Sequence, residues 1–201
     1  MDVLKENCIF LMNIGAAKTE YSVLSRGGLF SNKMEKIGGN QIDQAIISHI
    51  RREYNFFVGK FAAEDLKNGL GTAIDCENDS VYVTGRSLIS GLPGEIEISS
   101  HEIFLATKPV LDQIIYGCQT FLERIPPEKL IQIKEGGLLL TGGVACLRNI
   151  TKYFEKEIGL PVIVHKRPAE STIEGIRKIL KSGICWELTY TMLDNRNRWI
   201  K

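Results

Sequence analysis

The spacing of hydrophobic residues at the start of the chain is typical of β-strands. Residues 8–14 form an apolar run that ends at the small residues of a turn, and residues 19–24 resume a strand-like pattern. A second turn at Gly27 and Gly28 leads into a third segment of the same kind, which ends near Lys36. We therefore expect three antiparallel strands at the start of the chain.

Helical spacing follows these strands. Apolar residues recur every three or four positions after Asn40, which is the expected N-cap, and Asp43 falls in the expected first turn. A second helix is expected over residues 61–70, between two glycines. It places Glu64 and Lys67 on neighbouring positions of one face, so both could reach a ligand together.

The middle of the chain predicts a hairpin and a long helix. Alternation in residues 81–83 and 96–98, on either side of a glycine-rich loop, predicts two strands with one polar face. Ser99 and Glu102 have the spacing of a capping box, so a helix should begin there, with Pro109 expected to kink it.

The last third alternates strands and helices. Strands are expected over residues 136–140 and 162–164, with a glycine turn and a helix between them. A final helix over residues 169–181 should turn its apolar stripe inward, and that stripe consists of Ile173, Ile176 and Leu180. This order predicts an α/β fold, and the polar hairpin with its neighbouring helices suggests an inserted lobe.

Composition narrows the class of protein. The 201 residues are 44% hydrophobic and 24% charged, which is enough to bury a core of ordinary size, and we expect His49 and four phenylalanines, Phe61, Phe104, Phe121 and Phe154, to pack within it. A net charge of +1 with interspersed signs makes nucleic acid an unexpected partner. Five scattered cysteines without a CxxC pair argue against disulfides or structural zinc, and no apolar run has the length of a signal or spanning segment. A cytoplasmic protein is expected.

Two segments have residues suited to binding a phosphorylated ligand. In residues 13–19, NIGAAKT, small residues in a strand-to-strand turn allow backbone N–H groups to approach an anion, and Thr19 adds a hydroxyl. An ordinary hairpin turn is the more frequent explanation of such a segment. In residues 140–149, LTGGVACLRN, glycines follow a buried strand and open a helix, so ribose and phosphates could lie against bare backbone. Neither segment has the spacing of a Rossmann turn or a P-loop.

These segments belong to a colinear series that resembles the MreB family of bacterial actin-like cell-shape proteins. NIGAAKTE is similar to the family's DIGGGTTE, IGGNQIDQAIISHIRREY to its GGDxFDxAIxxYIRRxY helix, and AAEDLKNGLGTA to its AExxKxxIGxA helix. Further along, GRSLISGLPG, the IPPE corner, LLLTGGVACLRNI and the PVIV strand resemble the later motifs in order. The resemblance runs from near Cys8 to near Leu180.

The resemblance implies an actin-like ATPase fold of the ribonuclease-H type, of which this sequence matches the second half. The expected lobes are a discontinuous nucleotide-binding lobe over residues 8–39 and 135–181 and a smaller α+β lobe inserted over residues 40–134. Residues 182–201 form a C-terminal tail to which no site is assigned.

The resemblance also implies where ATP or ADP binds. Gly15 and Thr19 occupy the family's second phosphate loop, and Glu64 and Lys67 occupy its nucleoside contacts. Four residues fall in its adenosine motif: Gly142, Gly143, Leu147 and Arg148. Without the resemblance, Glu64 and Lys67 would be read as a solvated pair on a helix surface.

Departures from the family motifs weaken the case for chemistry. Asn13 replaces an aspartate whose charge would help hold Mg²⁺, so the metal is doubtful and no metal ligand is assigned. Lys18 replaces a threonine, and its ammonium either compensates near a phosphate or points into solvent.

The expected function follows from the half that is matched. The family's first phosphate loop and catalytic carboxylate belong to its other half, so we expect an MreB-like cell-shape protein, truncated to the nucleotide-binding second half, with little or no ATP hydrolysis alone and no catalytic residue. Expected partners are further copies, other MreB-type subunits or a separately encoded first half, with only indirect membrane association. The alternative is a nucleotide-free interaction module or the remnant of a truncated gene.

Overall fold

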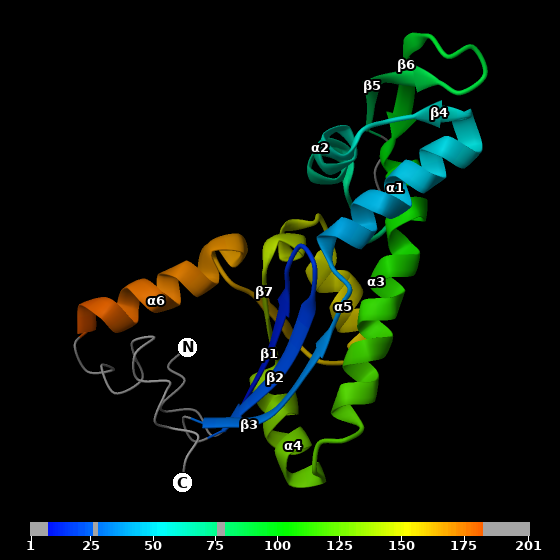
Figure 1. Cartoon of the computed structure of the whole chain (residues 1–201). Coiled ribbons are helices and arrows are strands. Elements are labelled where there is room, and N and C mark those ends of the chain that lie inside the picture. The colour runs from blue at the N-terminus through cyan, green and yellow to red at the C-terminus, as the bar shows by residue number, and fades with distance from the viewer. Residues whose placement is uncertain (1–7, 26–27, 76–78, 183–201) are drawn as a thin grey trace, which may run out of the picture. The chain divides into compact units, whose positions relative to one another are not determined.

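The computed structural model describes residues 8–25, 28–75 and 79–182 (Figure 1). The chain divides into two compact units, residues 1–169 and residues 170–201, and each is described by itself below.

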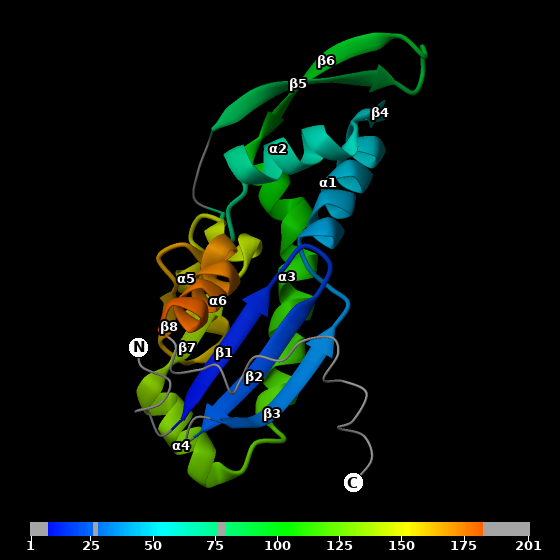
Figure 2. The ribbon, with the colours of Figure 1, turned by 60° about the vertical axis from the view of Figure 1, so that its left-hand side comes forward.

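A five-stranded sheet forms the centre of the first unit. Strands β1 (Ile9–Ile14), β2 (Thr19–Ser25) and β3 (Gly28–Glu35) are antiparallel neighbours, as the sequence predicted. Strands β7 (Leu138–Thr141) and β8 (Val162–Val164) continue the sheet in parallel, so that its order is β3-β2-β1-β7-β8. Segments from both ends of the unit therefore share one sheet, as Figure 2 shows.

One face of this sheet is covered by a long helix, α3 (Ser100–Leu122). The ring of Phe121 stacks on Phe10 of β1 and on Tyr21 of β2, with 5.9 Å between ring centroids in both pairs. The predicted capping box is confirmed, because the Ser99 hydroxyl accepts from the Glu102 backbone N–H and the Glu102 carboxylate accepts from the Ser99 N–H. Pro109 lies inside this helix.

Two further helices complete this region. Helix α5 (Ile150–Ile158) lies beside α3, and Gln119 of α3 donates to the backbone carbonyl of Glu157. Helix α4 (Pro127–Gly136) was not predicted, because its weakly patterned residues follow two prolines. Pro127 is the first residue of α4, where its missing N–H costs no hydrogen bond.

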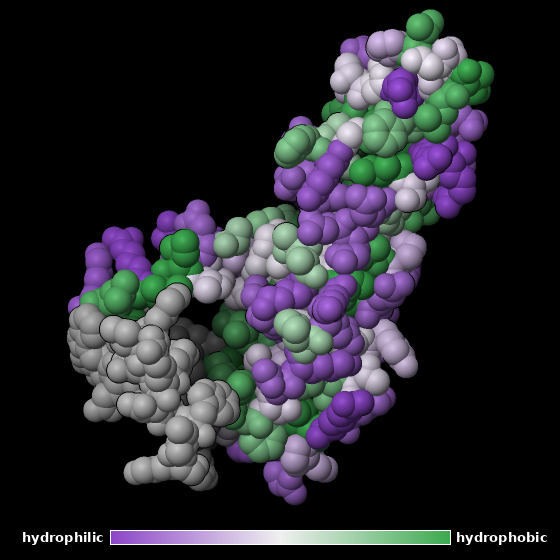
Figure 3. All heavy atoms as spheres, in the orientation of Figure 1, coloured by the Kyte–Doolittle hydropathy of each residue, from purple (hydrophilic) through white to green (hydrophobic). Residues whose placement is uncertain are grey.

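A second sheet of three antiparallel strands lies at the other end of the unit. It consists of β4 (Phe56–Phe57), β5 (Ser80–Ser87) and β6 (Pro93–Ser99), and the β5–β6 hairpin agrees with the prediction. Two helices accompany it, α1 (Gly39–Tyr54) and α2 (Lys60–Leu70). Apolar side chains gather at the end of this hairpin in Figure 3, where Ile89 is 84% exposed.

The N-cap predicted for α1 was wrong. The cap is Gly38, whose backbone N–H donates to the Gln41 side chain at 2.8 Å, and Asn40 lies inside the helix. Gly38 passes so close to the preceding turn that a Cβ there would lie 2.4 Å from the Gly15 carbonyl oxygen. The close approach explains why glycine occupies this position, although asparagine is a good cap elsewhere.

The predicted core is confirmed in part. Phe121, Phe154 and His49 are buried and Phe104 is half-buried, but Phe61 is 81% exposed. Phe61 is the second residue of α2, whose buried face consists instead of Ala63, Leu66 and Leu70. Among the described helices, none has both the length and the apolarity needed to cross a membrane.

The described part of the second unit is helix α6 (Ser171–Ser182), which follows a short 3₁₀ helix, η2 (Pro168–Glu170). Ile173, Ile176 and Leu180 are exposed, contrary to the expectation that they face inward. Within their own unit, the described residues include no second element that could cover them. The tail lies outside the described residues, and the proposed lobe boundaries at residues 39/40 and 134/135 stay a prediction.

Candidate functional site

The site lies where two parallel strands end side by side. Strands β1 and β7 are paired in parallel, with Asn13 opposite Thr141, so the turns that follow them leave the same edge of the sheet. In open α/β sheets, this edge is where ligands usually bind. The two segments singled out from the sequence are therefore neighbours in space.

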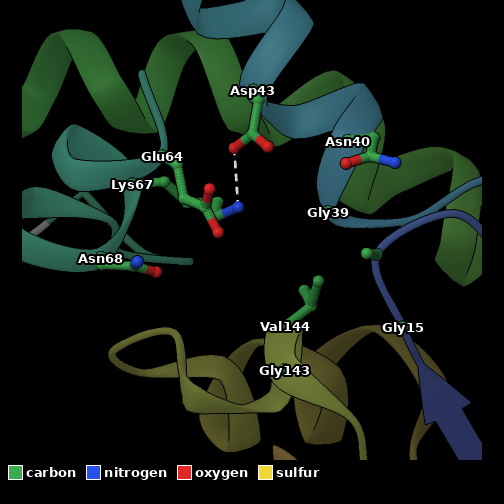
Figure 4. Close-up of a pocket in the computed structure, with 10 residues that line it drawn as sticks. Gly15, Gly39, Asn40, Asp43, Glu64, Lys67, Asn68, Gly143 and Val144 are labelled. Carbon is green, nitrogen blue, oxygen red and sulfur yellow. Dashed lines mark hydrogen bonds and ion pairs between the residues drawn. The ribbon is translucent and has the colours of Figure 1, made fainter. Parts of the chain in front are cut away.

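A pocket of about 140 Å³ opens at this edge (Figure 4). Its walls come from the β1–β2 turn, the first turns of α1, helix α2 and the turn after β7. The lining residues are Gly15, Ala16, Gly39, Asn40, Asp43, Glu64, Lys67, Asn68, Gly143 and Val144. A second pocket of about 210 Å³ shares Lys67, Asn68, Gly143 and Val144 with this first pocket and adds Cys146 and Leu147.

Five of the eight predicted site residues line these pockets. Gly15, Glu64, Lys67 and Gly143 line the first pocket, and Leu147 lines the second. The structure thus brings together residues that are up to 132 positions apart in the chain (Gly15 and Leu147, 147 − 15 = 132). Thr19, Gly142 and Arg148 line neither pocket, and each has a different role.

Thr19 is directed into the protein interior. Its side chain is fully buried, and its hydroxyl donates to the backbone carbonyl of Ile37 at 2.8 Å. A hydroxyl in this position joins the start of β2 to the segment between β3 and α1. The structure therefore does not present Thr19 to a phosphate at the first pocket.

The two glycines of the second segment differ in function. Gly142 is buried with φ +90°, and a Cβ on it would lie 2.2 Å from the Ile14 carbonyl oxygen. Its backbone conformation and the close approach of β1 both require glycine. Gly143 is exposed, lines both pockets and has nothing within 4 Å of a Cβ built on it. Gly143 is thus the glycine that leaves space for a ligand.

The glycines do not open a long helix, contrary to the expectation. They lead into a short 3₁₀ helix, η1 (Gly143–Cys146), and α5 begins only after Asn149, which has a left-handed conformation with φ 59°. The positive end of α5 is therefore not at the glycines, so no helix dipole favours an anion at Gly142 and Gly143.

Arg148 fastens two walls of the site together. Its guanidinium pairs with Asp79 at 3.0 Å and donates to the Gly69 carbonyl at 3.1 Å. Its backbone accepts from the N–H of Ala73 at 2.9 Å and donates to the carbonyl of Gly71 at 3.3 Å. The residue joins the end of α2 to the segment before α5, which is a structural role.

Asp43 was not among the predicted site residues. Its carboxylate lies 2.6 Å from the Lys67 ammonium, and the two side chains are only 3% and 11% exposed (Figure 4). In the sequence, Asp43 is visible only as a charged residue beside the apolar stripe of α1. Its partner Lys67 lies 24 positions away on another helix (67 − 43 = 24), so helical spacing cannot predict the pair. Within the described residues, Glu64 forms no hydrogen bond or ion pair, so its carboxylate is available in the pocket.

The β1–β2 turn holds its own charged network. Glu20 accepts from Lys18 at 2.5 Å and from the Asn13 amide at 3.3 Å, and the hydrogen bond from Lys18 lowers the pKa of Glu20 below its usual 4.5. The Lys18 side chain is half exposed and engaged in this pair. Among the described residues, no group of three or more His, Cys, Asp or Glu side chains could hold a metal ion.

Known proteins of one family resemble this chain. The family model described as MreB/Mbl protein matches residues 1–184. The cell shape-determining protein MreB of Escherichia coli (strain K12) is 35% identical over 172 residues, which are 85% of this chain and 50% of that protein. The cell shape-determining protein Mbl of Bacillus subtilis (strain 168) is 29% identical over 98% of this chain and 56% of that protein.

Solved structures agree with this assignment. The crystal structure of MreB5 of Spiroplasma citri bound to AMPPNP is 31% identical, with a TM-score of 0.88 over 94% of this chain and 56% of that one. A MamK double helical filament, at 17% identity and a TM-score of 0.73, shares the fold. The actin-like fold expected from the sequence is therefore confirmed, and the chain spans about half the length of the relatives it matches. This chain belongs to the MreB/Mbl family of cell shape-determining proteins.

Proposed function

We propose that the two adjoining pockets bind ATP or ADP and that the protein acts in a cytoplasmic, actin-like cytoskeleton that determines cell shape. The observation that carries this proposal is the convergence of Gly15, Glu64, Lys67 and Gly143 on one pocket. These four residues come from three separate segments, and the resemblance had assigned all four residues to nucleotide contacts. The structures of MreB5 bound to AMPPNP and to ADP support the same ligand class.

The fit of a nucleotide rests on the shape of this site. Gly143 leaves open space at the wall that the two pockets share, and Leu147 and Val144 give the second pocket an apolar surface suited to a base. Glu64 offers a carboxylate that can accept hydrogen bonds from hydroxyl groups. The residues fit Mg²⁺ poorly, because Asn13 is neutral and Glu20 is already engaged by Lys18, so the proposal leaves the metal out.

We further propose that these 201 residues hydrolyse ATP little or not at all by themselves. Phosphoryl transfer depends on groups positioned around the phosphate, and the family resemblance assigns the first phosphate loop and the catalytic carboxylate to the other half. Further copies or MreB-type subunits are the proposed partners, and the filaments of MamK support self-association.

Isothermal titration calorimetry with ATP and ADP, with and without Mg²⁺, tests the binding proposal. The informative variant is Gly143→Arg, which places a long side chain in open space at the pocket wall and should abolish binding without unfolding the protein. The matched control is Gly59→Arg, because Gly59 is exposed, also has nothing within 4 Å of its built Cβ and lines neither pocket.

Saturable binding that is lost in Gly143→Arg and kept in Gly59→Arg supports the proposal. No heat at millimolar nucleotide, together with no thermal shift, favours the alternative of a nucleotide-free interaction module. That alternative has its own support in the exposed apolar end of the β5–β6 hairpin, where Ile89 and Leu92 are exposed.

A further inference from the structure

A groove of about 300 Å³ lies between α2 and β5, and it shares no lining residue with the two nucleotide pockets. Helix α2 lines it with the buried side chains of Leu66 and Leu70 and with the exposed Asp65. Strand β5 lines it with four consecutive residues, 81–84. Because successive side chains of a strand point to opposite faces, a groove lined by consecutive residues follows the backbone edge of the strand.

This edge of β5 has no neighbouring strand over most of its length. Strand β4 pairs with Arg86 and Ser87 alone, and among the described residues no strand pairs with residues 80–85 on the side away from β6. Helix α2 lies beside the β5–β6 hairpin instead (Figure 2). An open edge of this kind can bind the backbone of another extended chain.

The register of the hairpin identifies the backbone groups at the open edge. The N–H of Ser87 donates at 3.0 Å to the carbonyl of Leu92, which is the residue opposite Ser87 when the register is continued. Opposite residues of an antiparallel pair alternate between bonded and non-bonded pairs, so Tyr82 and Thr84 direct their N–H and C=O groups away from β6. In the part of the chain that the structure describes, these outward groups form no hydrogen bond.

The side chains around the open edge are acidic and aromatic. Tyr82 is 72% exposed and lies opposite Glu97 of β6, and Thr84 lies opposite Glu95. Both glutamates are exposed, as is Asp65 on the α2 side of the groove. The basic residue of β5 lies beyond the open part, where β4 covers the edge. A ligand that matches this surface is therefore extended, partly apolar and positively charged.

We propose that this groove binds an extended segment of a partner protein, in which apolar residues alternate with lysine or arginine, as an additional strand on β5. The outward backbone groups of Tyr82 and Thr84 bond to the segment, and the groove beside α2 accommodates its apolar side chains. The carboxylates at the rim select its basic side chains. This site is separate from the proposed nucleotide binding, so either proposal can fail without the other.

Fluorescence anisotropy tests the site with the whole chain and a labelled peptide of about nine residues in which lysine alternates with valine. Saturable binding with a dissociation constant below about 1 mM is expected. The same peptide with every backbone nitrogen methylated should not bind, because it keeps the side chains and charge but has no N–H donors. Absence of binding by the first peptide, or equal binding of both peptides, overturns the proposal.

The informative variant is Thr84→Pro. It removes an N–H that faces the groove and puts a ring in its place, while the hydrogen bonds between β5 and β6 stay intact, so peptide binding should weaken by at least about tenfold. The matched control is Thr84→Val, which keeps the N–H and should bind within about twofold of the wild type. Unchanged binding in a folded Thr84→Pro overturns the added strand.

An exchange of charge keeps the proposal testable where Thr84→Pro does not fold. Asp65→Lys should weaken binding of the lysine peptide by about fivefold and strengthen binding of the corresponding glutamate peptide. The control is Glu123→Lys, which makes the same charge change at an exposed position outside the groove, the C-cap of α3. Equal effects of the two variants would mean that only net charge matters, and the site would be overturned.

Sedimentation of the chain alone distinguishes a partner protein from a second copy. The wild type and Thr84→Pro should show the same state of association, because the proposed occupant is a different protein. Self-association that Thr84→Pro abolishes, together with no binding of the lysine peptide, would assign the groove to a second copy and overturn the proposed partner.

Discussion

The turn after β1 and the turn after β7 leave the same sheet edge and both line the first pocket, yet only the second has a glycine with open space beside it. In the β1–β2 turn, backbone groups bond to one another and to the start of α1, with Gly15 N–H donating to Lys18 and Gly39 N–H donating to Gly15, both at 2.9 Å. After β7, Gly143 has open space beside it. Similar glycine-containing turns can thus be hydrogen-bonded to neighbouring backbone or leave open space beside a glycine, depending on what packs against them.

The largest expected effect separates the two glycines of the second turn. Gly142→Ala should destabilise the protein by about 3 kcal/mol or more, because φ +90° is strained for alanine and its Cβ would meet the Ile14 carbonyl oxygen at 2.2 Å. Gly143→Ala should change the free energy of unfolding by less than about 0.5 kcal/mol, because its Cβ meets nothing. Urea denaturation of both variants measures this difference. If both variants lost the same free energy of unfolding, Gly143 would have no open space beside it.

A smaller effect tests the closed turn. Thr19→Val should destabilise the protein by about 1 to 1.5 kcal/mol, because the Ile37 carbonyl loses a buried hydrogen bond, while the nucleotide affinity of the folded protein stays the same. Thr107→Val is the matched control, since Thr107 is also fully buried and donates to a backbone carbonyl, that of Phe104 in α3. Calorimetric titration of both variants with ATP measures whether their nucleotide affinity is unchanged. A weaker affinity for ATP in Thr19→Val alone would restore Thr19 as a phosphate ligand.

The smallest effect concerns Lys18. Lys18→Met should raise the pKa of Glu20 toward 4.5 and cost a few tenths of a kcal/mol near neutral pH, because both partners of this ion pair are partly exposed. The folded state lowers the pKa of Glu20, so the pair stabilises the protein above pH 4.5 and this stability is lost as the pH falls through the lowered pKa.

Denaturation at several pH values measures this difference, which should disappear in acid. Lys108→Met is the control, since Lys108 pairs with Asp112 on α3 at a similar exposure. A loss of ATP affinity specific to Lys18→Met would mean that Lys18 leaves Glu20 for a phosphate, and the first turn would then take part in binding.

Sequence patterns predicted the elements whose signals are local. The apolar run of β1, the strand-like pattern of β2, the alternation of the β5–β6 hairpin and the capping box of α3 are all local signals, and the structure confirms these elements. Helix α4 was missed because its pattern is weak, and the cap of α1 was wrong because close approach to another turn required glycine. A tertiary contact decided the cap of α1, whereas the local pattern of α4 was too weak to predict a helix.

The site was predictable to the extent that the family motifs mark it. Gly15, Glu64, Lys67, Gly143 and Leu147 line the pockets as the resemblance suggested. Membership of a motif does not distinguish residues that line a pocket from residues that hold its walls in place. Thr19, Gly142 and Arg148 were therefore predicted as site residues although they line neither pocket. Asp43 was missed for the opposite reason, because its partner lies on another helix and only the fold brings the pair together.

The backbone contacts of Arg148 also have a mechanical consequence. Because Ala73 and Gly71 bond to the two sides of this residue, the end of α2 and the segment before α5 cannot separate without breaking this short parallel bridge. Two walls of the pocket should therefore move as one rigid body, and the amide hydrogens of Ala73 and Arg148 should exchange with solvent at matched rates. A ligand therefore cannot enter the pocket by separating these two walls.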